Sequence, residues 1–411
     1  MLGCPVVSPA ALGASPELGF FISPTLALQI QNAIIGYQIY QLTADPFALG
    51  LVGLAEAIPY IGLVLLGGIV ADRFDRRRVS IIAFAVLLAA GVVLFFLSHH
   101  ATALEPRTLK RAVFGLIVTT GISRAFIQPS RTALGAQLAP RLLAAKAVAW
   151  RTGVFQLCSV VGPAIGGLLY GFWGPDGGYA IAAALLGLGC VALARLKVPP
   201  RVVRPRETSI FTQLGDGLRY LRGDDILRAA VLLDLFAVLF GGATALLPIF
   251  ANEILHVGAH GFGLLRAAPA AGALLVSVIL AARPPLGRAG VTLYFAVGGF
   301  GACMIGFALS RSFALSLLLL AASGGLDMVS VLIRGTLLQL RVPDEMMGRV
   351  ASINQVFVGS SNEIGAFESG LAARFLGVVP SVLAGGMVTL FVVLVSAKRS
   401  PKLRALKTLV D

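Results

Sequence analysis

Long apolar stretches alternate with short polar connections along most of the chain. Each long stretch is close to the roughly 20 residues that a helix needs to cross the hydrocarbon core of a membrane. Five of them contain no Asp, Glu, Lys or Arg: Val79–Ser98, Thr152–Pro175, Gly177–Ala194, Ala289–Ser310 and Phe375–Ala397. Together with stretches that carry isolated charges, the pattern predicts twelve transmembrane helices near 20–43, 47–71, 79–98, 108–134, 144–172, 177–195, 226–254, 260–282, 289–310, 313–336, 347–375 and 377–397.

The same layout occurs twice in the chain. At an offset of 203 residues the matched positions are Arg131 with Arg334, Pro140 with Pro343, Gly162 with Gly365, and Gly167 with Gly370. Nearer the start, Glu56 aligns with Arg266 at an offset of 210 residues. Duplicated bundles of this kind are typical of secondary transporters, whose substrate site lies between the repeats. We therefore predict an all-α integral membrane protein with twelve transmembrane helices in two pseudo-symmetric six-helix bundles.

The predicted domain organisation follows from this repeat. It comprises an N-terminal tail at 1–16, a first six-helix bundle at 17–195, a cytoplasmic linker at 196–225, a second six-helix bundle at 226–398 and a cytoplasmic tail at 399–411.

Composition and charge agree with a membrane protein. Hydrophobic residues make up 57% of the chain and charged residues only 13%. The net charge of +14 comes mainly from arginines and lysines at the connections on one side of the predicted helices. This is the positive-inside pattern, so we predict a multi-pass protein of the bacterial cytoplasmic (inner) membrane with both termini in the cytoplasm. The basic residues then face anionic membrane lipid, and we expect no nucleic-acid partner.

Catalytic and metal-binding patterns do not emerge from the sequence. The four cysteines show neither disulfide nor metal-ligand spacing. The sequence also lacks a Walker loop, which argues against transport driven by ATP, and no nucleophile–base spacing rises above background. We predict that the chain is not an enzyme and needs no metal or other cofactor.

Two motifs carry a family resemblance. Residues 68–78 read Gly-Ile-Val-Ala-Asp-Arg-Phe-Asp-Arg-Arg-Arg, between the second and third predicted helices. This segment resembles the loop signature of the major facilitator superfamily. In the fifth predicted helix, Gly162, Pro163, Gly166 and Gly167 resemble the end of a motif typical of exporters in that superfamily. The second half of the chain resembles the bacterial branch that contains the enterobactin exporter and multidrug efflux proteins.

The resemblance implies a role for the loop motif, in which Gly68, Asp72, Arg73 and Arg76 form a conformational latch. Asp72 would hold the start of the eleventh helix, near 346–349, when the cytoplasmic side is closed. The alternative is a plain positive-inside anchor, which explains the arginines but not Asp72. For the helix-five motif, gating and simple close packing of small residues are both compatible with the sequence.

Charges inside the predicted helices are the main candidates for function. A charge at the bilayer centre costs about 2.5–3.5 kcal/mol on insertion scales, so each should face the bundle interior and have a partner. The repeat aligns Glu56 with Arg266 and Arg124 with Asp327. Equivalent helices of the two halves face each other, so we predict an outer gate, Glu56–Arg266, and a deeper pair, Arg124–Asp327. Alternatively, neighbours within the same half satisfy each charge.

Asp234 is the leading candidate for a proton carrier. Its repeat mate is the neutral Gln31, so the alignment supplies no counter-charge for it. A buried carboxylate without a counter-charge takes up a proton more readily. Glu56, Asp327 and Glu363 are further candidates for a proton or substrate cavity, and all of these groups could instead be structural.

These patterns predict a secondary active transporter that works by alternating access. We expect a monomer that exports small hydrophobic or amphipathic molecules, such as drugs or siderophores, with the proton as coupling ion. One alternative is a transporter of lysophospholipid or other lipid. Another, of a different class, is a membrane sensor or scaffold that does not transport.

Overall fold

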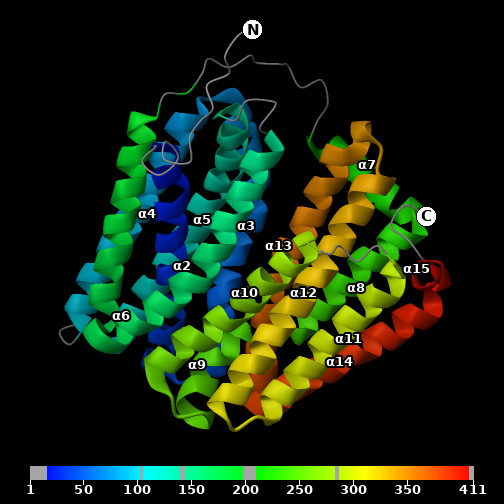
Figure 1. Ribbon diagram of the computed structural model, residues 1–411. Helices are drawn as coiled ribbons and strands as arrows, with labels where there is room; N and C mark the ends of the chain where they lie inside the picture. The colour runs from blue at the N-terminus through cyan, green and yellow to red at the C-terminus, as the bar shows by residue number, and fades with distance from the viewer. Residues whose placement is uncertain are drawn as a thin grey trace. The chain divides into compact units, whose positions relative to one another are not determined.

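A computed structural model of the protein describes residues 16–101, 105–138, 144–196, 198, 210–282 and 287–406. Within these ranges the regular structure is entirely helical, which confirms the predicted all-α class (Figure 1). Nine helices in the described part are long and apolar enough to cross a membrane. Helices α2 and α13 lie outside this set, and α6 holds two of the predicted helices. The count of twelve stays a prediction.

The chain divides into two compact units. The first comprises Met1–Ile35 and Gly62–Val203, and the second comprises Gly36–Ile61 and Arg204–Asp411. The units therefore differ from the two predicted repeats at residues 36–61. The two units are defined by contacts between residues, whereas the predicted bundles are defined by the sequence repeat. The predicted domain boundaries therefore stay a prediction. The predicted N-terminal tail lies outside the described residues except for Pro16.

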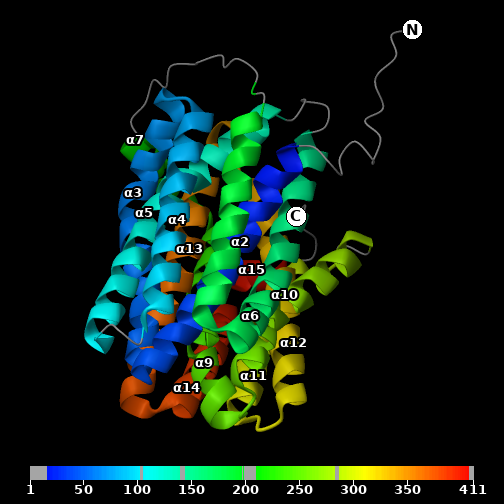
Figure 2. The ribbon, with the colours of Figure 1, turned by 90° about the vertical axis from the view of Figure 1, so that its left-hand side faces the viewer.

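The first unit is built from the long helices of the first half. These are α2 (Pro16–Thr43), α3 (Pro46–Arg73), α4 (Arg76–His99), α5 (Pro106–Leu138) and α6 (Ala144–Arg195), of which α2 and α3 are shared with the second unit. Helix α4 packs against both α5 and α6 (Figures 1 and 2). The core between them consists of large apolar side chains such as Phe20, Phe84, Leu87 and Leu186, all of which are fully buried.

Helix α6 contains a sharp break. Gly174 has φ +70°, a left-handed conformation that glycine adopts without the penalty of a side chain. Pro175 follows and cannot donate a backbone hydrogen bond to the preceding turn. The break separates 144–173 from 175–195, close to the boundary predicted between the fifth and sixth transmembrane helices.

The second unit contains the remaining helices. They are α7 (Ile210–Gly223), α8 (Asp225–Gly241), η3 (Thr244–Leu246), α9 (Leu247–Ile249), η4 (Phe250–Ile254), α10 (Gly258–Ala282), α11 (Ala289–Leu309), α12 (Phe313–Arg341), α13 (Asp344–Leu376), α14 (Val378–Arg399) and α15 (Pro401–Ala405). Helix α12 packs against α10 and α11, and α14 packs against α11 and α8 (Figure 1). We call the end where α8 begins and α12 and α14 finish the basic end of this unit, and the opposite end its far end.

The predicted helix 226–254 matches one candidate membrane span, Asp225–Ile254, but this span is not one continuous α-helix. Helix α8 stops at Gly241, and a 3₁₀ turn, a short α-turn and the π-helical turn η4 follow it. The Gly241–Gly242 pair weakens helix propagation at the end of α8, and Pro248 cannot donate a backbone hydrogen bond to the turn before it. A π-helical turn is rare and frequently marks a functional position. Here it sets the direction of Asn252 and Glu253.

Candidate functional site

A buried ion pair joins α8 and α12. An oxygen of the Asp234 carboxylate lies 2.6 Å from Nη2 of Arg334, and each side chain is only 6% exposed. The Nε of Arg334 also donates to Oγ of Ser330, one turn earlier on α12, at 3.3 Å. The repeat alignment supplied no counter-charge for Asp234, and the structure supplies one. The alignment compared only repeat mates, and the partner of Asp234 comes from another helix of the same half.

Asp327 completes a group of three charges, which we call the inner triad. Asp327 precedes Arg334 by seven residues on α12, so both lie on one helix face. Its carboxylate interacts electrostatically with Arg334 and also with Asp234. Asp234, Asp327 and Ser330 line a small cavity whose other walls are apolar, formed by Ala237, Val238, Val297 and Phe300. One guanidinium thus faces two carboxylates in a water-poor site.

Sequence reasoning missed Arg334 as a member of this site. The repeat alignment named Arg334 only as the mate of Arg131, whereas its side chain is buried two turns before the end of α12. Its spacing from Ser330 and Asp327, four and seven residues, was the available signal, because such positions share a helix face.

The repeat mate of Arg334 has different partners. In the first unit, Nη2 of Arg131 donates to the carbonyl oxygen of Phe21 at 3.0 Å and to Oγ1 of Thr25 at 2.8 Å. The guanidinium also lies over the rings of Phe20 and Phe21, 5.7 and 5.3 Å from their centroids. Gln31, the mate of Asp234, is fully buried, and its amide atoms find no hydrogen-bond partner within the described part of the chain.

A second group of charges, which we call the far triad, lies toward the far end of the second unit. The carboxylates of Glu363 on α13 and Glu56 on α3 both interact electrostatically with Arg266 on α10. Glu56 is 9% exposed, and the other two side chains are half-buried. The structure thus brings together the two residues predicted as an outer gate and adds Glu363. Their role as a gate stays a prediction.

Two tyrosines of α2 reinforce this region. The hydroxyl of Tyr37 donates to Oδ1 of Asn252 at 2.8 Å, and that of Tyr40 donates to Oε1 of Glu253 at 2.9 Å. Both acceptors lie on η4, so the π-helical turn presents two neighbouring polar side chains to α2. Residues 36–61 therefore pack with the second half of the chain at this end.

The predicted deeper pair, Arg124–Asp327, stays a prediction. Arg124 lies half-buried on α5 in the first unit. Asp327 interacts with Arg334 in its own half, as the alternative interpretation anticipated.

The helix-five motif lies where α6 crosses α2. A Cβ added at Gly162 would overlap the Cβ of Gln29, and one at Gly166 would lie 3.0 Å from the carbonyl oxygen of Ile30. Gly167 is buried, and Pro163 lies inside the helix without ending it. The Nε2 of Gln29 donates to Oγ of Ser159 at 2.7 Å across the same contact. The small residues permit close packing, and a gating role stays a prediction.

The loop motif surrounds the end of α3. Arg76 donates to the carbonyl oxygens of Ala71 and Ala133 at 3.3 and 3.2 Å, which ties the loop to α5. Arg73 is the exposed last residue of α3, and Gly68 has open space beside it. The side chain of Asp72 lies outside the described part of the structure. The latch itself stays a prediction.

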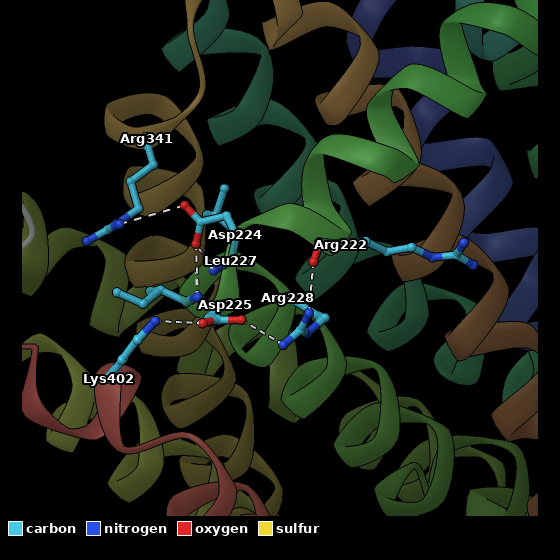
Figure 3. Close-up of polar contacts among 8 residues, drawn as sticks. Arg222, Asp224, Asp225, Leu227, Arg228, Arg341 and Lys402 are labelled. Carbon is cyan, nitrogen blue, oxygen red and sulfur yellow. Dashed lines mark hydrogen bonds and ion pairs between the residues drawn. The ribbon is translucent and has the colours of Figure 1, made fainter.

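Polar contacts also organise the basic end of the second unit (Figure 3). The Asp224 carboxylate caps α8 by accepting from two backbone N–H groups and lies 3.7 Å from Nη1 of Arg341. Asp225 lies between Arg228 and Lys402, at 2.8 Å from each. Lys402 belongs to α15, so the chain after α14 is attached to the start of α8 (Figure 3). Asp225, Arg228 and Lys402 are exposed, whereas Asp224 and Arg341 are partly buried, and all five act as structural ties.

Comparison with known proteins identifies the family. The family model described as transmembrane secretion effector matches residues 22–409. The chain belongs to this family. It is also similar to the enterobactin exporter of Escherichia coli O81 (strain ED1a), with 27% identity over 393 residues, 93% of this chain and 91% of the relative.

Solved structures of the same fold include two transporters. A D-xylose–proton symporter superposes with a TM-score of 0.71 at 16% identity, covering 95% of this chain and 99% of the other. A POT family transporter in complex with 5-aminolevulinic acid also gives 0.71, at 14% identity and with 95% and 97% coverage. The protein is therefore a multi-pass membrane transporter of the major facilitator superfamily, and it is not an enzyme. The resemblance inferred from the two motifs is confirmed.

Proposed function

We propose that the protein is a proton-coupled exporter of small hydrophobic or amphipathic molecules, and that the inner triad is its proton-binding site. The observation that carries the proposal is the pairing of Asp234 with Arg334 at 2.6 Å while Asp327 lies within their electrostatic reach. The arginine balances one carboxylate, and the other carries an excess negative charge in a site poor in water.

Burial makes such an excess charge unfavourable. An ionised group deep in a membrane protein is costly and generally serves a pathway for ions or protons. A proton on Asp234 or Asp327 would neutralise the excess, and its release would restore it. The proton can thus be bound and released without disrupting the surrounding apolar core. Arg334 limits the site to about one proton, because it remains charged in either state.

Export and substrate class rest on similarity and charge distribution. The enterobactin exporter is a relative along nearly its whole length, which supports outward transport of siderophore-like or drug-like amphipathic molecules. The clustered arginines and lysines support an inner-membrane location with the basic end and both termini in the cytoplasm. A monomer is sufficient, because substrate and proton sites lie within one chain in this type of transporter.

Proton release on substrate binding tests the proposal. Purified protein in weakly buffered detergent solution is mixed with enterobactin, ethidium or lysophosphatidylglycerol, and a pH indicator reports released protons. We expect enterobactin or ethidium to release about one proton per bound molecule from the wild-type protein. Asp234→Asn should bind the same molecule, measured by fluorescence or calorimetry, without releasing a proton.

The matched control is Asp225→Asn, which makes the same substitution on the same helix at an exposed position. It should release protons as the wild type does. If Asp234→Asn released protons at the wild-type level, the inner triad would not be the proton-binding site. A response to the lysophospholipid alone would favour a lipid transporter. Failure to bind any of the three, together with no uptake into proteoliposomes, would favour a sensor or scaffold.

A further inference from the structure

We propose that the far triad, formed by Glu56, Arg266 and Glu363, is a second proton-binding site, and that a proton bound there releases α3 from α10 and α13. The far triad has the same composition as the inner triad, with two carboxylates acting on one guanidinium. Its three members come from three different helices. Its protonation therefore changes how those helices are held together.

The carboxylate of Glu363 lies directly against α3. A Cβ added at Gly53 would lie 3.5 Å from Oε2 of Glu363, 3.2 Å from its backbone oxygen and 3.0 Å from the Cβ of Ala366. Gly53 precedes Glu56 by three residues, so the two carboxylates are neighbours along α3. The single guanidinium of Arg266 attracts both carboxylates and so offsets their mutual repulsion.

Helices α3 and α13 make a close backbone contact beside the far triad. A Cβ added at Gly370 of α13 would lie 2.7 Å from Cα of Gly50 on α3. Small residues let two membrane helices approach until their backbones touch, which maximises packing over a narrow seam. Such a seam is either engaged or separated, because packed interfaces do not deform continuously. A charge change beside it can therefore act as a switch.

Protonation changes the balance at the seam. When both glutamates are ionised, Arg266 attracts Glu56 and Glu363 together and so links α3 to α10 and α13. A proton on Glu56 removes its charge and most of its attraction to Arg266, which then pairs with Glu363 alone. Helix α3 loses its electrostatic link to the second half and keeps only the packing of the seam.

Other charged and titratable groups face the same end of the unit. On the elements that pack here they are Tyr37 and Tyr40 of α2, Asp45 before α3, Tyr60 of α3, Glu253 of η4, His260 of α10, and Glu368 and Arg374 of α13. Tyr40 and Glu253 share a hydrogen bond, and Arg374 lies 4.0 Å from Asp45 and over the ring of Phe47. These contacts hold α2, α3, η4 and α13 together. They therefore limit how far the loss of one charge pair can move α3 away from α10 and α13.

Distance measurement by electron paramagnetic resonance tests the proposal without any substrate. Spin labels replace Ile58 on α3 and Phe375 on α13, both exposed, in a protein whose four cysteines are serine. We expect lower pH to increase the population with a long distance between the labels. Glu56→Gln should show that population at neutral pH, with the ratio of long to short distances raised about tenfold or more, and should lose most of its pH dependence.

Glu363→Gln is the second variant, and it keeps the test decisive if Glu56→Gln fails to fold. The matched control is Glu368→Gln, on the same helix five residues later, which should keep the wild-type pH response. His99→Gln and His260→Gln should also keep it. The proposal is overturned if Glu56→Gln and Glu363→Gln both retain the wild-type pH response, or if a histidine substitution abolishes it.

This inference rests on the proposed function only in taking the proton as the coupling ion. In the same assay Asp234→Asn should keep the pH response of the labels even though it loses proton release on substrate binding. Loss of proton coupling at Asp234 and loss of pH-controlled separation at Glu56 are thus separate results. Either proposal can fail while the other stands.

Discussion

Arg131 and Arg334 occupy equivalent positions in the two halves of the chain, yet their surroundings differ. Each lies seven residues before the last residue of its helix, α5 or α12. Arg131 is held by a carbonyl oxygen, a hydroxyl and two aromatic rings. Arg334 is held by a carboxylate and accompanied by a second one. The first position is occupied by a cation with neutral partners, and the second by a cation with titratable partners.

The difference indicates that the two halves share a scaffold but differ in the chemistry around the equivalent arginine. A common scaffold fixes an arginine at the same depth in both halves. Among the described residues, only the arginine of the second half has carboxylates beside it. Gln31 stands where the second half has Asp234, so the first half carries a neutral amide at this position. We infer that the proton chemistry proposed for the inner triad depends on residues of the second half alone.

The largest difference between the two positions should come from removing each arginine. Arg334→Ala strands a buried carboxylate, which typically costs about 3–5 kcal/mol of stability. Arg131→Ala leaves only neutral acceptors unpaired, for which about 1–3 kcal/mol is typical. Denaturant titration in mixed micelles measures both, with the exposed Arg228→Ala as control. Equal losses at the two positions would contradict the comparison.

A double-mutant cycle sharpens the same contrast. Combining Asp234→Ala with Arg334→Ala should give a coupling free energy of about 2–3 kcal/mol, at the upper end for residues in direct contact. The corresponding cycle of Thr25→Ala with Arg131→Ala should give about 0.5–1.5 kcal/mol, as expected for one hydrogen bond. Unfolding in the same micelles supplies the four stabilities of each cycle. A larger coupling in the first half would reverse the interpretation.

Glycine substitutions should show that both halves depend on close helix packing at equivalent glycines. A Cβ at Gly162 would overlap Gln29, and one at its mate Gly365 would lie 2.7 Å from the carbonyl oxygen of Leu239. Gly162→Ala and Gly365→Ala should each cost about 1–3 kcal/mol, the usual range for overpacking. Gly153→Ala on α6 and Gly348→Ala on α13 are matched controls, because both have open space. Thermal unfolding in detergent measures all four, and a clear loss at the controls would argue against a steric cause.

The smallest expected effect concerns the partner of Asp327. Its interaction with Arg334 is within the second half, whereas the sequence repeat pairs it with Arg124. We expect Asp327 to couple to Arg334 by about 1 kcal/mol and to Arg124 by less, because Asp327 interacts with Arg334 on the same face of α12. Two double-mutant cycles that share Asp327→Ala compare the pairs directly. A stronger coupling to Arg124 would restore the predicted cross-half pair.

Much of the architecture could be predicted from the sequence. The uncharged stretches at 79–98 and 289–310 correspond closely to α4 and α11, because apolar runs of this length are stable in a membrane as helices. The break at Gly174 was also predictable, since glycine followed by proline interrupts a helix. The segmented helix after Gly241 was not, because apolar composition alone does not distinguish α-, 3₁₀- and π-helical turns.

The candidate site was only partly predictable. The sequence placed Asp234, Asp327, Glu56, Arg266 and Glu363 within membrane helices, where a charge needs a partner. It also indicated an encounter of Glu56 with Arg266 through the repeat. It did not indicate that Arg334 would pair with Asp234, because the alignment compares equivalent helices and not neighbours within one half.

The sequence by itself determined which segments are long and apolar, at which positions the same motif residues recur, and which predicted helices carry charge. These properties are local, since they depend on the polarity and spacing of residues along the chain. The tertiary structure alone decided which charges meet. Arginine side chains are long, and their partners depend on how each helix is rotated and how closely it approaches its neighbours. For this reason Arg131 and Arg334 share a repeat position, while only Arg334 pairs with a carboxylate.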